Sequence, residues 1–342
     1  SYSNLVDSLL VMPVVAPPKL PSLDRPELKE MLQVDHSSNS NNSYQELHVA
    51  LLNLMPDAAL QATERQFISL LGSSNEFLVH VYPTSIDIGS RGQEYQKYIQ
   101  DYYNDIQSIY GMPIDGLIIS GANPSKPNIS EESFWSPLIE VMNWADQEVN
   151  SILCSCLATH ALMKAKFNID RKIRDSKSWG VFSHNLLNTN HALTQDLTND
   201  FEGPHSHYYD IPREEIEKTE LQILAENDEA GFFLASTENS DLVLFQGHPE
   251  YDKKSLLKEF QREIENFVNG LRSDYPPLPT EYFSKESLQL LDDIKKRTIE
   301  TMEKPVIPEN ELLSTLEANW QESGRGLYRN WLNILFDKKE RS

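Results

Sequence analysis

Short apolar runs alternate with longer amphipathic stretches between residues 47 and 167, and this alternation constrains the fold more than any other feature. The apolar runs predict buried strands at 47–54, 77–82, 115–121 and 151–155. A helical pattern follows each strand, at 58–71, 93–109, 131–148 and 157–167. Strands that are joined by helices pair in parallel. The sequence therefore predicts an α/β fold, an open, mostly parallel sheet with helices on both faces.

The regions outside this alternation set the expected domain boundaries. Residues 1–45 contain several prolines and the polar run His36–Ser43, which is typical of a mobile linker, so we expect an irregular leader. We place the main domain at 46–275. Residues 276–342 predict a helical extension packed on that domain, with helices at 286–302 and 309–320 and a solvated end at Lys338–Arg341.

Weaker signals complete the main domain. Further strands are expected at 179–187, 221–225, 231–235 and 242–246, and a helix at 254–271. Asp57 is expected to cap the helix at 58–71, which Gly72 ends. In open parallel sheets the chemistry gathers at the carboxyl ends of the strands, so residues just after each strand are the first candidates for a site.

Charge and composition exclude several classes of function. The formal net charge is −22, so nucleic acids and anionic membrane surfaces would be repelled. No apolar run reaches the roughly 18 residues of a transmembrane helix. Cys154 and Cys156 are too few and too close for a disulfide framework. We therefore expect a cytoplasmic protein with neither a nucleic-acid nor a membrane partner.

Cys156 is the candidate nucleophile. It stands between the strand predicted at 151–155 and the helix predicted at 157–167, where a sharp turn presents the sulfur to the helix N-terminus. The N–H groups near Leu157, with the turn at Gly121 and Ala122, predict an oxyanion hole. Cys154 is expected to face the core as a small apolar residue.

His248 and Glu250 are the candidate partners of the thiol. They follow a predicted strand in Gly-His-Pro-Glu, and a histidine oriented by a carboxylate serves as a general base. His160 lies along the helix after the thiol, and we interpret it as structural. His205 and His207 fall short of a zinc pattern, so no metal site is expected.

Several segments, taken together and in order, resemble the homoserine O-succinyltransferase type of homoserine O-acyltransferases. The segments are Leu52–Pro56, Asp115–Ala122, Gly180–Phe182, Pro204–Ser206, Glu229–Gly231 and Gly247–Asp252. The resemblance covers roughly residues 45–275, with a weaker match at Tyr328–Asn333. It implies a flavodoxin-like fold related to class I glutamine amidotransferases.

The resemblance also implies roles for individual residues. Cys156 matches the nucleophile that becomes an acyl thioester, His248 the general base and Glu250 its partner. In the same way, substrate-binding residues are matched by Lys177, Ser206 and Arg262, the last of which suits the carboxylate of an amino acid.

The resemblance places Ser125 at the position that determines the acyl-donor specificity of the family. A large acidic residue there accompanies acetyl transfer, whereas the small Ser125 leaves room for a succinyl group and removes a repelling carboxylate. The resemblance therefore favours succinyl-CoA as the donor.

The sequence departs from the family pattern near the site. Asp57 and Ala58 stand where the family has a pair of lysines, so one lysine that would help the oxyanion is missing. The nucleophile turn reads Cys-Leu-Ala-Thr-His rather than Cys-Trp-Gly-Ala-Gln, and His207 replaces an arginine after Pro-His-Ser. These differences leave the acceptor amino acid open.

The expected reaction is ping-pong transfer of a succinyl group from succinyl-CoA to the hydroxyl of L-homoserine, as in methionine biosynthesis. Acyl-CoA is then a co-substrate, and no permanently bound cofactor is implied. Acetyl-CoA as donor and serine or another hydroxyl compound as acceptor remain alternatives. So do a glutamine amidotransferase-like hydrolase and a non-catalytic binding protein, and the assembly is either a monomer or a homodimer.

Overall fold

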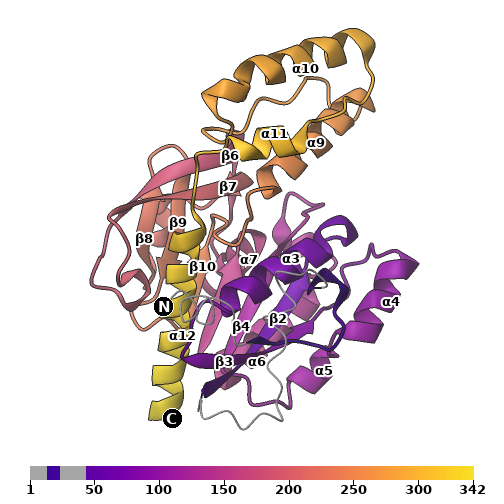
Figure 1. Ribbon diagram of the computed structural model, residues 1–342. Coiled ribbons are helices and arrows are strands. Elements are labelled where there is room, and N and C mark those ends of the chain that lie inside the picture. The colour runs from indigo at the N-terminus through magenta and orange to yellow at the C-terminus, as the bar shows by residue number, and fades with distance from the viewer. Residues whose placement is uncertain (1–13, 24–43) are drawn as a thin grey trace, which may run out of the picture.

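The computed structural model describes residues 14–23 and 44–342, and within them ten strands form one mixed sheet (Figure 1). The strands are β1 (Val14–Val15), β2 (Gln45–Leu54), β3 (Phe77–Thr84), β4 (Gly116–Ala122), β5 (Ser151–Ser155), β6 (Lys172–Leu186), β7 (Asp200–Asp210), β8 (Gln222–Asn227), β9 (Gly231–Ser236) and β10 (Leu242–Phe245). Their order in the sheet is β1-β3-β2-β4-β5-β10-β9-β8-β6-β7.

The sheet has a parallel half and an antiparallel half. Every pair from β1 to β10 in this order is parallel. Every pair from β10 to β7 is antiparallel. The parallel half is the part in which strands and helices alternate along the sequence, so the predicted α/β fold is confirmed.

Helices cover both faces of the parallel half. The α-helices are α3 (Asp57–Leu71), α4 (Gln93–Tyr102), α5 (Ile106–Ile109), α6 (Trp135–Glu148), α7 (Leu157–Phe167), α8 (Arg213–Ile216), α9 (Ser255–Val268), α10 (Leu288–Thr301), α11 (Glu309–Ser314) and α12 (Gln321–Arg341). Successive strand residues point to opposite faces. Accordingly, Val49 and Leu51 of β2 pack in the cluster that includes α3 and α12, and Ala50 and Leu52 pack with α6 and α7.

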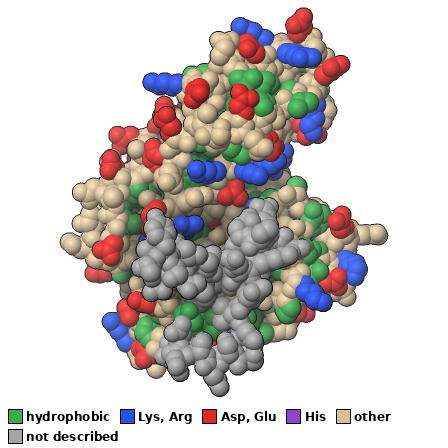
Figure 2. All heavy atoms as spheres, in the orientation of Figure 1, with side chains coloured by type: hydrophobic (Ala, Val, Ile, Leu, Met, Phe, Trp, Pro, Cys, Tyr) green, Lys and Arg blue, Asp and Glu red, His purple; other side chains and the backbone are tan. Residues whose placement is uncertain are grey.

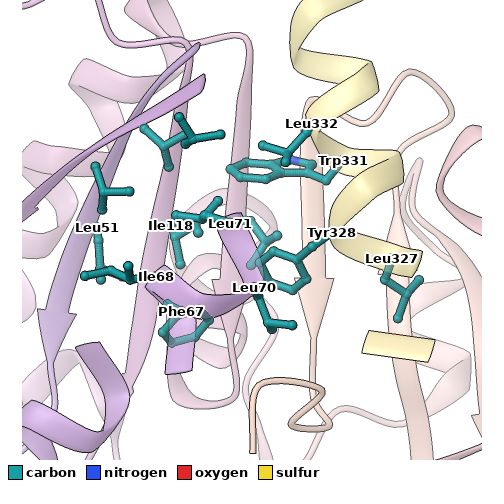
Figure 3. Close-up of a cluster of buried hydrophobic side chains, with 14 of the residues drawn as sticks. Leu51, Phe67, Ile68, Leu70, Leu71, Ile118, Leu327, Tyr328, Trp331 and Leu332 are labelled. Atoms are coloured by element: carbon teal, nitrogen blue, oxygen red, sulfur yellow. The ribbon is translucent and has the colours of Figure 1, made fainter. Parts of the chain in front are cut away.

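The C-terminal helix α12 is part of the core of the main sheet. Figure 3 shows its apolar side chains facing those of α3, and Leu51 and Ile118 belong to the same cluster. A Cβ atom added to Gly116 of β4 would lie 2.8 Å from Leu335 Cδ1, so the helix approaches the strand as closely as a glycine allows. Trp331, fully buried, donates its indole N–H to Ser151 Oγ at 2.9 Å.

Helices α9, α10 and α11 form a separate lobe at one end of the molecule (Figure 1). Their buried side chains, including Phe260, Leu291 and Leu312, cluster around Trp179 of β6. The chain then returns through Trp320 into α12, which runs back along the body. None of the described helices is long and apolar enough to cross a membrane.

Several expectations need correction. Val14–Val15 of the leader is an edge strand paired with β3, and the polar run His36–Ser43 lies outside the described residues. The expected helix at 93–109 is two helices, and the one expected at 309–320 ends at Ser314. Strand β7 was not predicted, and α12 lies within the predicted helical extension although no individual helix was expected at its residues.

Two predicted local roles are also wrong. Asp57 does not cap α3, whose N-cap is Pro56; its carboxylate instead accepts the N–H of Gly92 at 2.8 Å and pairs with Arg91. The C-terminal lysines are not a solvated end. Lys338 donates to the carbonyl of Asn150, and Lys339 donates to a carbonyl of β2, because α12 is docked along the body.

Candidate active site

Cys156 lies on a strained turn between β5 and α7. Its φ of 51° and ψ of −107° place a non-glycine residue outside the favoured backbone regions. Such strain persists only where surrounding contacts fix it, and a strand–nucleophile–helix turn is a known example. The Cys156 N–H donates to the Phe245 carbonyl of β10 at 2.8 Å. The turn is therefore anchored to the neighbouring strand.

The two cysteines differ sharply in environment. Cys154 is fully buried in the cluster beneath α7, and burial raises the pKa of its thiol well above the ordinary value. Cys156 is partly exposed. Of the two thiols, Cys156 is the one that a substrate can reach.

His248 and Glu250 meet Cys156 because β10 pairs in parallel with β5. Phe245 lies opposite Ser155, so both strands end at the same edge of the sheet. His248 Nδ1 is 2.7 Å from Glu250 Oε1, and the Cys156 side chain lies close enough to act on the same imidazole. Burial alone would lower the pKa of His248, but Glu250 and Cys156 together hold that pKa well above its usual value.

Two further contacts fix the imidazole. Tyr251 stacks on the His248 ring with centroids 4.3 Å apart, and Ser155 Oγ donates to Glu250 Oε1 at 3.4 Å. The backbone N–H of His248 donates to the carbonyl of Pro204 in β7 at 2.9 Å. The histidine is thus held by a carboxylate, an aromatic ring and the backbone.

The three residues predicted to hold an oxyanion lie around the thiol. Leu157 is the first residue of α7, directly after Cys156, and Ala122 ends β4. A Cβ atom added to Gly121 would lie 3.8 Å from Cys156 Cβ. The carboxyl end of β4 therefore borders the sulfur, as its place beside β5 requires.

Lys177 and Ser206 converge on Glu259, a residue that sequence reasoning missed. Lys177 Nζ of β6 is 3.8 Å from Glu259 Oε1, and Ser206 Oγ of β7 donates to the same oxygen. Burial lowers the pKa of Lys177. Glu259 Oε2 is buried without a hydrogen-bond partner in the described structure. A helix-surface glutamate carries no sequence signal by itself, and only the fold places it here.

The Glu259 group is linked to the catalytic candidates through Tyr251. Burial, followed by the charges of Glu259 and Glu250, raises the pKa of Tyr251 well above its usual value, so the phenol lies within electrostatic range of Glu259. Because the Tyr251 ring also stacks on His248, the two groups of residues form one continuous site.

Arg262 lies one turn beyond Glu259 on α9 and is exposed. Both line a cavity of about 810 Å³ between α3, α9 and residues 304–309, which Met55 and Tyr251 also border. Lys254, Lys258 and Lys304 add positive charge to its walls. Figure 2 shows Lys and Arg side chains gathered where the lobe meets the body, on a chain of net charge −22.

Ser125 lies in the exposed loop after β4. Its N–H and Oγ donate to the carboxylate of Glu132 at 2.6 and 2.9 Å, and the Lys126 N–H donates to Oε1 of the same carboxylate at 2.7 Å. Glu132 therefore fixes the shape of this loop.

The remaining histidines singled out from the sequence are buried. His160 Nε2 lies 3.1 Å from Gln246 Oε1. His205 Nε2 is 2.8 Å from His184 Nε2, and the His207 ring packs against His205. Within residues 14–23 and 44–342, no group of three or more His, Cys, Asp or Glu side chains is arranged to hold a metal ion.

The architecture is shared with a solved protein. A glutamine amidotransferase from Methylobacillus flagellatus aligns with a TM-score of 0.50 over 85% of this chain and 96% of its own, at 13% identity. At that identity the likeness shows the fold alone. The fold is that of the glutamine amidotransferase-like class, which agrees with the expectation drawn from the sequence.

The sequence comparisons are more specific. The profile of the family described as homoserine O-succinyltransferase matches residues 13–341. A homoserine O-succinyltransferase of Methylobacter tundripaludum is 42% identical over 95% of this chain and 94% of its own. One of Methylococcus capsulatus is 40% identical over 95% and 93%. The chain belongs to the homoserine O-succinyltransferase family and is an acyltransferase.

Proposed function

We propose that the chain transfers the succinyl group of succinyl-CoA to the hydroxyl of L-homoserine through an acyl thioester on Cys156. The observation that carries this proposal is the grouping of three residues: Cys156 on a strained strand-to-helix turn, His248 within electrostatic range of its sulfur, and Glu250 hydrogen-bonded to His248. A thiol paired with a histidine, itself oriented by a carboxylate, is the arrangement of nucleophilic acyl transfer. The family of the chain supports the donor and the acceptor.

The first half-reaction acylates the enzyme. The Cys156 sulfur attacks the carbonyl carbon of succinyl-CoA, the new C–S bond forms, and the bond to coenzyme A breaks as its sulfur leaves with a proton from His248. The oxyanion in between is stabilised by N–H groups near Leu157, Gly121 and Ala122. One thioester replaces another, so the step is nearly balanced in energy.

The second half-reaction releases the product. His248 takes the proton of the homoserine hydroxyl, the oxygen attacks the acyl carbon, and the bond to Cys156 breaks. Homoserine carries an ammonium and a carboxylate group. The Glu259 carboxylate suits the ammonium group, and the Arg262 guanidinium suits the carboxylate. Both residues border a cavity whose volume lies in the range of small-molecule sites, about 300–1,000 Å³. The product is one that methionine biosynthesis uses.

Release of coenzyme A tests this proposal. Succinyl-CoA without homoserine is expected to release one equivalent of coenzyme A per active site, and continued turnover is expected only when L-homoserine is added. L-Serine in place of homoserine and acetyl-CoA in place of succinyl-CoA serve as the comparison substrates. Glutamine hydrolysis without any transfer from succinyl-CoA would contradict the proposal.

A further inference from the structure

Arg171 is held beside the Ser125 loop by contacts that fix its guanidinium. It lies between α7 and β6, with its guanidinium carbon 4.0 Å from the centroid of the Tyr209 ring. Its Nη2 donates to the carbonyl of Lys126 at 3.1 Å. Because an aromatic face and a carbonyl hold the group, little freedom remains to be lost when an anion binds.

The charge of Arg171 is not neutralised by a direct ion pair within the described residues. The carboxylate of Glu132 acts on it electrostatically, but the three donors from Ser125 and Lys126 already occupy that carboxylate. Arg171 Nε is buried and has no hydrogen-bond partner. A buried donor without a partner is costly, and in a native protein it points to a missing ligand or water.

Arg171 also lies within electrostatic range of the candidate nucleophile. Burial lowers its pKa, while Tyr209, Glu132 and Cys156 act in the opposite direction. The guanidinium thus contacts the loop that carries Ser125 and lies within electrostatic range of the sulfur.

We propose that Arg171 binds the free carboxylate of the succinyl group while that group is attached to Cys156. This inference rests on the proposed function and adds the residue that selects a dicarboxylic acyl group. A guanidinium presents planar N–H donors that match a carboxylate, and an acetyl group offers nothing for them to bind. Lys126 and Ser125 shape the other wall of this anion subsite.

The experiment measures the second-order rate constant for Cys156 thioester formation, from the burst of coenzyme A, with two donors. Succinyl-CoA carries the carboxylate, and butyryl-CoA has the same chain length without it. The variants are Arg171→Met and Arg171→Lys. Lys172→Met is the matched control, because it removes an exposed cation one position further along the chain.

Arg171→Met is expected to slow succinylation about 10- to 100-fold, because the charge-assisted hydrogen bonds to the succinyl carboxylate are lost. The rate of butyrylation should not change, because butyryl-CoA has no carboxylate. Arg171→Lys keeps the charge without the planar donors, so its loss should be smaller and again confined to succinyl-CoA. Lys172→Met is expected to match wild type with both donors. Circular dichroism and thermal unfolding establish that each variant is folded.

Equal loss with both donors, in either Arg171 variant, would overturn the inference, because it would mean that Arg171 only supports the fold around Cys156. An unchanged donor preference in Arg171→Met would overturn it as well, while leaving the proposed function in place. A wild-type protein that forms a thioester with neither donor would overturn the proposed function itself.

Discussion

Gly324 of α12 lies against the backbone of Pro249, in the turn that carries His248 and Glu250: a Cβ atom added to Gly324 would be 2.8 Å from the Pro249 carbonyl oxygen. Trp320, just before the helix, donates its indole N–H to the carbonyl of Tyr251 at 2.7 Å. The C-terminal segment therefore packs against the turn that carries His248 and Glu250, although α12 begins only at Gln321, far from Cys156 in the sequence.

This contact predicts that Gly324→Ala displaces the catalytic turn. The added methyl meets backbone, which must shift, so we expect a loss of about 1–3 kcal/mol in the free energy of unfolding and about a tenfold or greater loss in the acylation rate. Gly326→Ala is the matched control, because its methyl meets only the ends of two side chains, Leu197 and Arg329, and no backbone. Equal effects of the two substitutions in urea unfolding and in coenzyme A release would refute the supporting role.

His248 and Glu250 should act as one unit. The 2.7 Å contact between Nδ1 and Oε1 orients the imidazole toward Cys156, so His248→Ala is expected to lower turnover about 10²–10⁴-fold. The double variant with Glu250→Gln should be little worse than His248→Ala alone, since coupled catalytic residues are not additive. Steady-state rates for all three variants give the answer. A double variant that shows the full product of the single losses would place Glu250 in a separate role.

The position of Ser125 predicts donor choice. Ser125→Glu places a negative charge where the succinyl carboxylate would lie, and the repulsion costs roughly 1 kcal/mol or more when water is partly excluded. Succinyl-CoA should then acylate Cys156 more slowly than acetyl-CoA, the reverse of the order expected for wild type. Ser125→Gln, which has the size without the charge, should keep the wild-type order. Were the two variants to behave alike, charge at position 125 would have no part in the choice.

Buried histidines predict a loss of stability in acid. Burial lowers the pKa of His160 and of His184 to about 4 in each case, whereas an unfolded histidine titrates near 6.5. The unfolded state therefore takes up protons first. These two histidines leave the free energy of unfolding unchanged above about pH 6.5 and lower it as the pH falls from there toward about 4.

His160→Gln isolates one of these groups. Glutamine does not titrate, and its amide N–H replaces the hydrogen bond to Gln246. The slope of the free energy of unfolding against pH in acid should fall by up to about 1.4 kcal/mol per pH unit, which is the slope that the uptake of one proton on unfolding produces. Urea unfolding at a series of pH values between 7.5 and 4 measures the slope. An unchanged slope would mean that His160 takes up its proton equally well in both states.

The strand and helix on either side of Cys156 could be predicted to the residue, because an apolar run changes directly into a helical pattern there. The catalytic candidates follow from the same reasoning, since parallel strands end at one edge of the sheet. Strand β7 could not be predicted, because Pro204 within it argues against a strand. Its residue Ser206 was found only through the family resemblance.

Helix α12 was missed for a related reason. Gly324 and Gly326 weaken its helical propensity. The apolar side chains between Leu327 and Leu335 form only a short pattern within an otherwise polar segment. Those glycines are required by close contacts that exist only in the folded chain. The roles of Glu259 and Arg171 could not be predicted from the sequence, because only the folded chain brings their partners next to them.

The central claim is the acyl thioester on Cys156, and intact-protein mass spectrometry after brief exposure to succinyl-CoA tests it most directly. The wild-type protein is expected to gain the mass of one succinyl group, located by proteolysis on the peptide that contains Cys156 and removed by hydroxylamine or by L-homoserine. Cys154→Ser should gain the same mass, and Cys156→Ser should gain none. A succinyl group that appears on Cys156→Ser, or turnover by that variant with no covalent intermediate, would contradict the account.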